Sequence, residues 1–150
     1  MQIKVEGLQE VCERFNTLPK RLRVTMQIAN ACALRDIQKT AQQSHRFHTR
    51  TGLLERSITK EEFTGTIGGR VYLDDTMAAY GPFVHQGTRP HDIKPRKKTV
   101  LRWPVRGGFV FSKHVHHPGT RPDQFIFRAG RINREHVRDL YREAIKEVTK

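Results

Sequence analysis

The sequence is poor in cysteine and has no long apolar run. Its two cysteines, Cys12 and Cys32, form no Cys-x-x-Cys pair, so we expect reduced, partly buried thiols in a cytosolic protein. No stretch approaches the roughly 18 apolar residues that a membrane span needs, and residues 1–15 lack the apolar segment of a signal peptide. We therefore expect a protein made and kept in the cytoplasm, or built into something assembled there, with no membrane partner.

The sequence also lacks the short motifs that mark many enzymes. It contains no G-x-S-x-G, G-x-x-x-x-G-K-[ST] or G-x-G-x-x-G, so it advertises no nucleophile elbow, phosphate loop or dinucleotide site. Two carboxylate pairs, Glu61-Glu62 and Asp74-Asp75, are adjacent in sequence. Adjacent side chains in a strand point to opposite faces, so these pairs make poor acid–base dyads. We expect no enzymatic activity and no cofactor.

Histidines form two groups, which raises the question of a metal site. His45 and His48 lie three residues apart, and His114, His116 and His117 lie close together. Neither spacing matches His-Glu-x-x-His, and no carboxylate or cysteine is near either group in sequence. We expect exposed polar histidines on loops and no bound metal. A metal-dependent hydrolase that uses the second group stays open as an alternative.

Acidic residues are few relative to basic ones. The chain has 28 lysines and arginines but 15 aspartates and glutamates, for a net charge of +13. This balance favours an anionic neighbour such as nucleic acid, a membrane surface or an acidic protein. Much of the charge lies in a basic patch that only Asp92 opposes and that includes Trp103 in its span. The members of the basic patch are Arg89, Lys94, Arg96, Lys97, Lys98, Arg102 and Arg106.

The basic patch has three interpretations. The favoured one is a solvated loop and strand face, with Trp103 in the core. Basic residues beside an aromatic can also grip a nucleic-acid strand, although no RNP motif, helix-turn-helix pattern or zinc-finger spacing accompanies them. The third interpretation is contact with an acidic neighbour in an assembly, or with DNA crossing a channel.

Helical periodicity is the strongest pattern that is present. Apolar residues recur at steps of three and four from Leu22 to Ala41, which predicts a long helix after a break at residues 16–18, with Pro19 in its first turn. Its broad stripe suits burial against the core alone, or against the core and a partner subunit. We also expect a short helix over residues 8–15, an exposed loop over 45–52 and a last helix capped by Asp123.

Shorter segments predict β-structure. Alternation indicates a first strand at residues 2–6 and further strands at 57–63 and 66–73. Residues 101–105 and 109–111, joined at Gly107-Gly108, have the pattern of a β-hairpin, with Pro104 on an edge. The order of elements predicts a single α+β domain over residues 1–150. Its antiparallel sheet of about four strands packs against a long helix in the N-terminal half and a C-terminal helix.

Three stretches together have the order and spacing of motifs in a known family. They are TGLLERSI at residues 51–58, YGPFVHQGT at 80–88 and HPGTRPDQFI at 117–126. They resemble the tail-component family of lambda-like long-tailed phages, which includes tail-completion and head–tail joining proteins. That family has T-G-x-L-x-x-S-I, then Y-x-x-[FY]-[VL]-E-x-G-T, then an entry of P-F-L type to a C-terminal helix. The run RWPVRGGFVF within residues 97–111 is similar to its hairpin, and the resemblance extends from about Leu18 to the end.

The resemblance implies a non-enzymatic structural subunit of a bacteriophage or prophage virion. Such a subunit forms a ring with copies of itself and docks to neck or connector and tail-tube proteins, in the host cytoplasm and then in the virion. Transient contact with DNA is compatible with this role. The motif loops supply the expected subunit or partner contacts, which are Arg50, Thr51, Gly52, Tyr80, Phe83, His85, Gly87, Thr88, His117, Gly119 and Thr120.

Two residues depart from the family's pattern. The family's glutamate before x-G-T is His85 here, and Gln124 stands where a proline often precedes the phenylalanine. We expect His85 to change a subunit contact or its response to pH. The alternative to the phage interpretation is a cytosolic nucleic-acid-binding module that uses the basic patch of residues 89–106.

Overall fold

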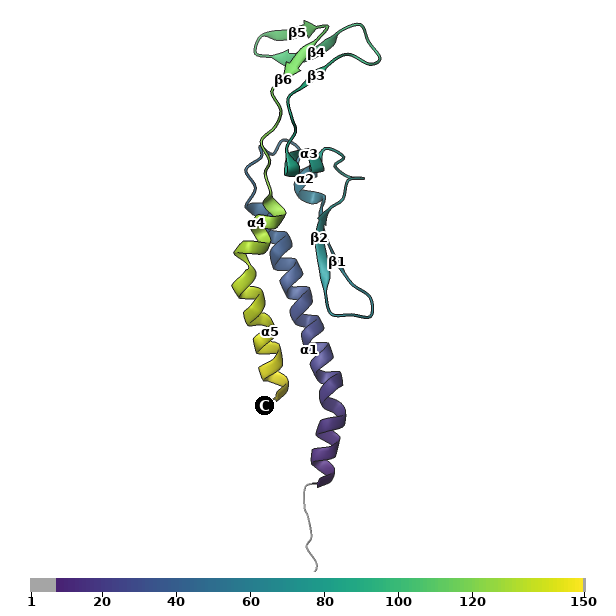
Figure 1. Cartoon of the computed structure of the whole chain (residues 1–150), viewed down its shortest axis with the longest axis vertical. Coiled ribbons are helices and arrows are strands. Elements are labelled where there is room, and N and C mark those ends of the chain that lie inside the picture. The colour runs from purple at the N-terminus through teal and green to yellow at the C-terminus, as the bar shows by residue number, and fades with distance from the viewer. Residues whose placement is uncertain (1–7, 150) are drawn as a thin grey trace, which may run out of the picture.

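The computed structural model describes residues 8–149, with side chains from residue 18 to residue 149. A body of helices, with one β-hairpin at its side, carries a thin β-arm at one end (Figure 1). The predicted strand at residues 2–6 lies outside the described residues. The elements are, in chain order, α1 (Leu8–Gln43), α2 (Leu53–Arg56), β1 (Ile58–Glu62), β2 (Gly69–Leu73), α3 (Gly81–Gln86), β3 (His91–Ile93), β4 (Leu101–Val105), β5 (Gly108–Ser112), β6 (Val115–His117), α4 (Phe125–Ile132) and α5 (Arg134–Thr149).

Helix α1 is longer than the sequence predicts. It runs for 36 residues through Pro19, so the expected break at residues 16–18 and the separate helix over 8–15 were wrong. A proline inside a helix removes one backbone hydrogen bond and costs about 3 kcal/mol. The apolar pattern nevertheless keeps one phase across it, because Phe15, Leu18 and Leu22 follow at steps of three and four. One continuous apolar stripe therefore spans the proline.

Helices α1 and α5 run side by side in opposite directions along the body (Figure 1). Ala33 on α1 and Ala144 on α5 are both buried, and such small side chains let two helix backbones approach closely. The buried amide of Asn30 accepts a hydrogen bond from the Tyr141 hydroxyl at 3.0 Å and donates one to the Gly68 carbonyl at 3.2 Å. A single side chain thus links α1, α5 and the turn between β1 and β2.

The main core lies where α1, the β1–β2 hairpin and α4 meet. Ala41, Ile58 and Phe125 are fully buried there, and burial of a side chain the size of Phe125 contributes roughly 2–3 kcal/mol. Strand β2 starts at Gly69, where a Cβ atom would collide with the Leu34 side chain and with the neighbouring strand. Glycine at this position therefore allows the hairpin to approach α1.

The strands form three separate antiparallel pairs, β1–β2, β3–β6 and β4–β5. The α+β class, the antiparallel pairing, the long helix and the C-terminal helix are confirmed, whereas the count of about four strands in one sheet was loose. Of the three pairs, the β1–β2 hairpin is the one that packs on α1. The other two pairs lie in a stretch, residues 86–122, in which no residue is buried. The predicted hairpin is β4–β5, which pairs Leu101 with Ser112 and Val105 with Gly108.

The last predicted helix is divided in two at Asn133. The Asn133 side chain donates hydrogen bonds to the Thr40 hydroxyl at 2.8 Å and to the Ala129 carbonyl at 2.9 Å, so the break between α4 and α5 is fastened to α1. The predicted cap was also wrong. Gln124 is the N-cap of α4, without a side-chain hydrogen bond, because the carboxylate of Asp123 is directed to the loop that follows α1.

Candidate interaction surfaces

A pocket lies between the loop that follows α1 and helix α3. Residues 47–55, Tyr80 and Val84 line its volume of about 420 Å³. Four predicted contact residues take part, namely Arg50, Thr51, Gly52 and Tyr80. The structure therefore brings together two motifs that are well separated in sequence.

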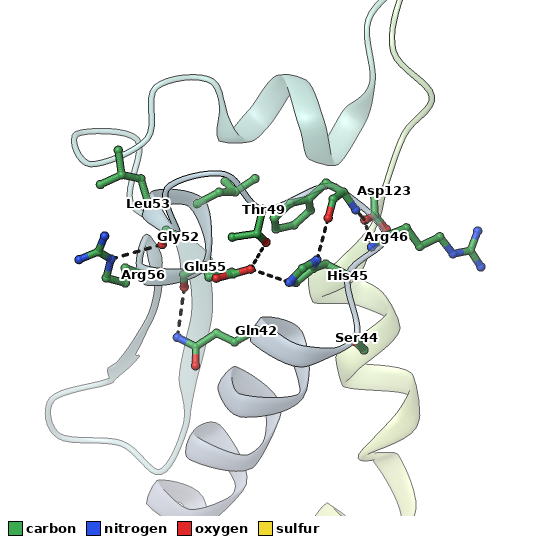
Figure 2. Close-up of polar contacts among 12 residues, drawn as sticks. Gln42, Ser44, His45, Arg46, Thr49, Gly52, Leu53, Glu55, Arg56 and Asp123 are labelled. Atoms are coloured by element: carbon green, nitrogen blue, oxygen red, sulfur yellow. Dashed lines mark hydrogen bonds and ion pairs between the residues drawn. The ribbon is translucent and has the colours of Figure 1, made fainter.

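Glu55 holds the loop that lines this pocket (Figure 2). Its carboxylate lies 2.8 Å from His45 Nε2 and accepts a hydrogen bond from the Thr49 hydroxyl. Its backbone carbonyl accepts a hydrogen bond from the Gln42 side chain at 3.1 Å. The His45 ring also stacks on Phe47, with ring centroids 3.9 Å apart. His45 was expected to be exposed, but it is half-buried and fixes the loop, with a carboxylate ten positions away as its partner.

Glycine is required where this loop enters α2. Gly52 has φ of 69°, a left-handed conformation that side chains with a Cβ disfavour. The Arg56 guanidinium donates a hydrogen bond to the Thr51 carbonyl at 2.9 Å. The left-handed conformation of this turn therefore accounts for the glycine at position 52.

Large apolar side chains are exposed around the pocket. Leu53 and Tyr80, which line it, are 39% and 46% exposed, and Phe83 on α3 is 60% exposed. We call the pocket with these three side chains the α2–α3 surface. Clustered exposed apolar groups are typical of protein contact sites, whereas single ones are ordinary.

Asp123 joins the segment between β6 and α4 to the loop that follows α1. Its Oδ2 atom accepts hydrogen bonds from the Arg46 and Phe47 amides at 2.5 and 3.1 Å, and its Oδ1 atom pairs with Arg128 at 2.7 Å. Arg128 also donates to the Ser44 carbonyl at 2.6 Å. Burial by itself raises the pKa of Asp123, but the hydrogen bonds from the Arg46 amide, Arg128 and the Phe47 amide, together with the charge of Arg128, hold that pKa below its usual value. Asp123 is a charged junction that the sequence did not reveal.

His85 lies inside the body and not on a contact surface. Only 8% of it is exposed, and its ring packs against Phe125 and Phe127 with centroid distances of 5.1 and 5.2 Å. Its Nε2 atom is buried without a hydrogen-bond partner among residues 18–149. Burial lowers the pKa of His85 below 6.5, and the charge of Asp123 opposes this in part. The expectation that His85 touches a partner directly does not fit this position.

Four further predicted contact residues form the junction where the arm leaves the body. We call this junction the neck of the arm, which is unrelated to the neck of a phage particle. Thr88 and Thr120 exchange backbone hydrogen bonds at 3.0 and 3.2 Å. Gly87 and Gly119 have φ of 76° and 88°. A Cβ on Gly87 would lie 2.6 Å from the Thr120 carbonyl oxygen, and one on Gly119 would collide with the Thr88 carbonyl. Each glycine therefore leaves space for the backbone of the opposite threonine. This close approach explains why both positions in the neck are glycine.

The arm, residues 88–122, carries the whole basic patch, and every member is exposed. Two histidines on it contact Asp92, with His114 Nε2 at 3.3 Å and His116 Nδ1 at 2.8 Å. His117 is half-buried in β6 and its Nδ1 accepts a hydrogen bond from the Gly119 amide at 3.1 Å. In the described part of the chain, no group of three or more histidines, cysteines or carboxylates is arranged to hold a metal ion.

The β4–β5 ribbon has two unlike faces. Its register pairs Arg102 with Phe111 and Pro104 with Phe109, so these four side chains share one face. Phe109 and Phe111 are 52% and 61% exposed, a feature that the sequence analysis missed although the hairpin pattern contained it. Trp103 lies on the other face, half-buried over a hollow that also involves β3 and β6. The expectation that Trp103 belongs to the main core was wrong.

Comparisons with protein-family models, curated proteins and solved structures found no match to the chain. Within residues 8–149, no helix has both the length and the hydrophobicity to cross a bilayer.

Proposed function

We propose that the protein is a non-enzymatic structural subunit of a phage or prophage particle, which completes the tail or joins head to tail. It does so by associating with copies of itself and by docking to neck and tail-tube proteins. The α2–α3 surface carries this proposal. There, Thr51 and Gly52 from one motif of the resembled family and Tyr80 from another line one pocket, and two of the side chains that line it, Leu53 and Tyr80, are large, apolar and exposed.

The second support is the apolar stripe of α1, which extends beyond the core. Val24 and Ile28 are 55% and 59% exposed, whereas Ala29 and Ala33 on the same helix are buried. A helix with apolar groups on two sides suits a chain that is covered by a neighbour in its working state.

The two apolar surfaces lie on different elements, and this bears on the kind of assembly. Val24 and Ile28 belong to α1. Leu53 belongs to α2, Tyr80 directly precedes α3, and Phe83 lies in α3. Contact between two different surfaces is heterologous, and heterologous contacts generate rings when the rotation closes. A pairing of these two surfaces would therefore be compatible with the proposed ring, which needs no symmetric dimer face.

Photo-crosslinking tests the proposal in cells that produce the particle. A crosslinking amino acid replaces Phe83, and a control replaces the exposed Glu147 on α5. We expect position 83 to crosslink to a second copy of the chain or to neck and tail-tube proteins, and to do so more than position 147. Crosslinks at position 83 only to cytosolic enzymes, or none at all, would contradict a structural role.

A further inference from the structure

The arm concentrates positive charge without neutralising it. Residues 88–122 contain nine lysines and arginines and one aspartate, so nine less one leaves +8 of the chain's +13. All nine basic side chains are exposed. They are the seven members of the basic patch together with Lys113 and Arg121.

Some of the basic residues on the body have acidic partners. Four arginines there pair with carboxylates at 2.7 to 3.0 Å, which are Arg70, Arg128, Arg138 and Arg142. Among residues 18–149, none of the nine arm residues forms an ion pair. The arm's one carboxylate, Asp92, contacts His114 and His116 instead. The arm thus presents a positive field whose counter-charge lies outside the fold.

The shape of the arm suits a groove. The β4–β5 ribbon has two strands, which lie about 4.8 Å apart in such pairs, whereas the major groove of DNA is about 12 Å wide and admits a two-stranded ribbon. Its tip, Gly107-Gly108, has open space on both glycines. At the base of the ribbon, residues 94–100 form a loop with four exposed basic side chains, Lys94, Arg96, Lys97 and Lys98.

One face of the ribbon combines charge with aromatic rings. The Arg102 guanidinium carbon lies 3.6 Å from the centroid of the Phe109 ring, so the two side chains hold each other in place on the exposed face. Phe111 lies beside them, opposite Arg102 in the register. A fixed guanidinium can contact phosphates or base edges, and exposed rings can contact the sugars and bases next to them.

We infer that residues 88–122 are a nucleic-acid-binding arm, in which the β4–β5 ribbon enters a groove of duplex DNA and the loop 94–100 contacts its phosphates. This role is distinct from the protein contacts proposed for the α2–α3 surface. An acidic protein could also neutralise the positive charge of the arm. The narrow ribbon, its glycine tip and its aromatic face, however, fit the groove of a nucleic-acid duplex better than a flat acidic protein surface.

Fluorescence anisotropy of the full chain with a labelled DNA duplex of about 20 base pairs, across a salt series, tests the inference. The arm variant is Arg96→Ala/Lys97→Ala/Lys98→Ala. The control is Lys20→Ala/Arg21→Ala/Arg134→Ala, which removes the same charge from exposed positions of the body. We expect the arm variant alone to weaken binding about ten-fold or more and to lower the slope of log K against log salt by about 2 to 3. Equal losses in the two variants would overturn the inference.

Two competitors and one further variant determine whether the arm binds duplex DNA, single-stranded DNA or an acidic polypeptide. Single-stranded DNA of the same length should bind less tightly than the duplex, and polyglutamate of matched charge should not displace it. Phe109→Ala/Phe111→Ala should weaken duplex binding several-fold without changing the salt slope, because an apolar contact releases no counterions. Tighter binding of single strands, or displacement by polyglutamate, would overturn the duplex assignment. Crosslinking at position 83 should stay intact in every arm variant, which separates this result from the proposed function.

Discussion

Asp123 and His85 show how single side chains connect the arm to the body. The Asp123 carboxylate is bound by two loop amides and by Arg128, and the His85 ring fills the space against Phe125. Both lie within motifs that the sequence analysis assigned to partner contacts. Their positions indicate that part of each motif builds the fold, while the exposed part, such as Phe83, remains available for contact.

The first prediction concerns the charge at Asp123. Asp123→Ala leaves Arg128, whose side chain is 24% exposed, without its partner, and frees two amides, so we expect a loss of about 3 kcal/mol in the free energy of unfolding. Asp139→Ala removes an exposed pair with Arg142 and should cost about 0.5 kcal/mol or less. Urea denaturation measures both. Similar losses in the two variants would contradict the junction role of Asp123.

The second prediction concerns pH and His85. Because burial lowers the pKa of His85, the unfolded chain takes up a proton at a higher pH than the folded chain does. The contribution of neutral His85 is therefore fully present above 6.5 and is lost as the pH falls from 6.5 towards the folded pKa. We expect His85→Gln to flatten the fall in unfolding free energy over this range, and His48→Gln, at an exposed loop position, to leave it unchanged. A His85→Gln protein with the wild-type pH dependence would refute the argument.

At the scale of elements, Gly119 in the neck is needed both for its left-handed backbone conformation and for the close approach of a neighbouring backbone. Gly107, at the tip of the β4–β5 ribbon, is needed only for its conformation. Gly107 and Gly119 both have positive φ, 95° and 88°, but only Gly119 faces a neighbouring backbone. Gly107→Ala should therefore cost about 1–2 kcal/mol for the left-handed conformation alone. Gly119→Ala should also separate Thr88 from Thr120.

Amide hydrogen exchange distinguishes these two glycine variants. The amides of Thr88 and Thr120 donate the neck hydrogen bonds, so they should exchange much faster in Gly119→Ala than in the wild type, and at nearly the wild-type rate in Gly107→Ala. Unchanged protection in Gly119→Ala would show that the close approach of the strands is not needed to hold the neck.

Elements were predictable where a repeating pattern identified them locally. The stripe of α1, the strands β1 and β2 and the β4–β5 hairpin all follow from periodicity or turn residues. The pairing of β3 with β6 was not predictable, because His91 to Ile93 and Val115 to His117 are short, exposed and far apart in sequence. The break predicted at residues 16–18 is absent, because the apolar pattern keeps one phase across this segment and the helix continues through Pro19.

At the scale of the whole molecule, the sequence motifs predict which loops contact partners, but they do not predict how these loops divide between surfaces. The prediction of an exposed loop over residues 45–52 placed Arg50 correctly, since loop residues are usually exposed. Tyr80 and Phe83 also lie at exposed positions, and their contact with a partner stays a prediction. The sequence could not separate the α2–α3 surface from the neck, because that depends on the fold of residues 81–123. The separation matters, because one surface suits protein contact and the arm beyond the neck suits a polyanion.

Self-association should depend on the body and not on the arm. Phe83→Asp places a charge on the α2–α3 surface and should abolish or strongly weaken oligomer formation, because desolvating an unpaired charge is costly. Val110→Asp makes the same chemical change on the arm, at a side chain that is 38% exposed, and should leave oligomers intact. Sedimentation velocity over a concentration series compares the two. Loss of oligomers in the Val110→Asp variant alone would place the subunit contact on the arm.

Immunogold electron microscopy of purified phage particles, with quantitative mass spectrometry of the same particles, shows whether the protein is a structural subunit. We expect several copies in every particle, at the junction of head and tail. We also expect that, without this chain, heads and tails accumulate separately. A protein that is abundant in infected or induced cells but absent from particles and from assembly intermediates would contradict this structural role.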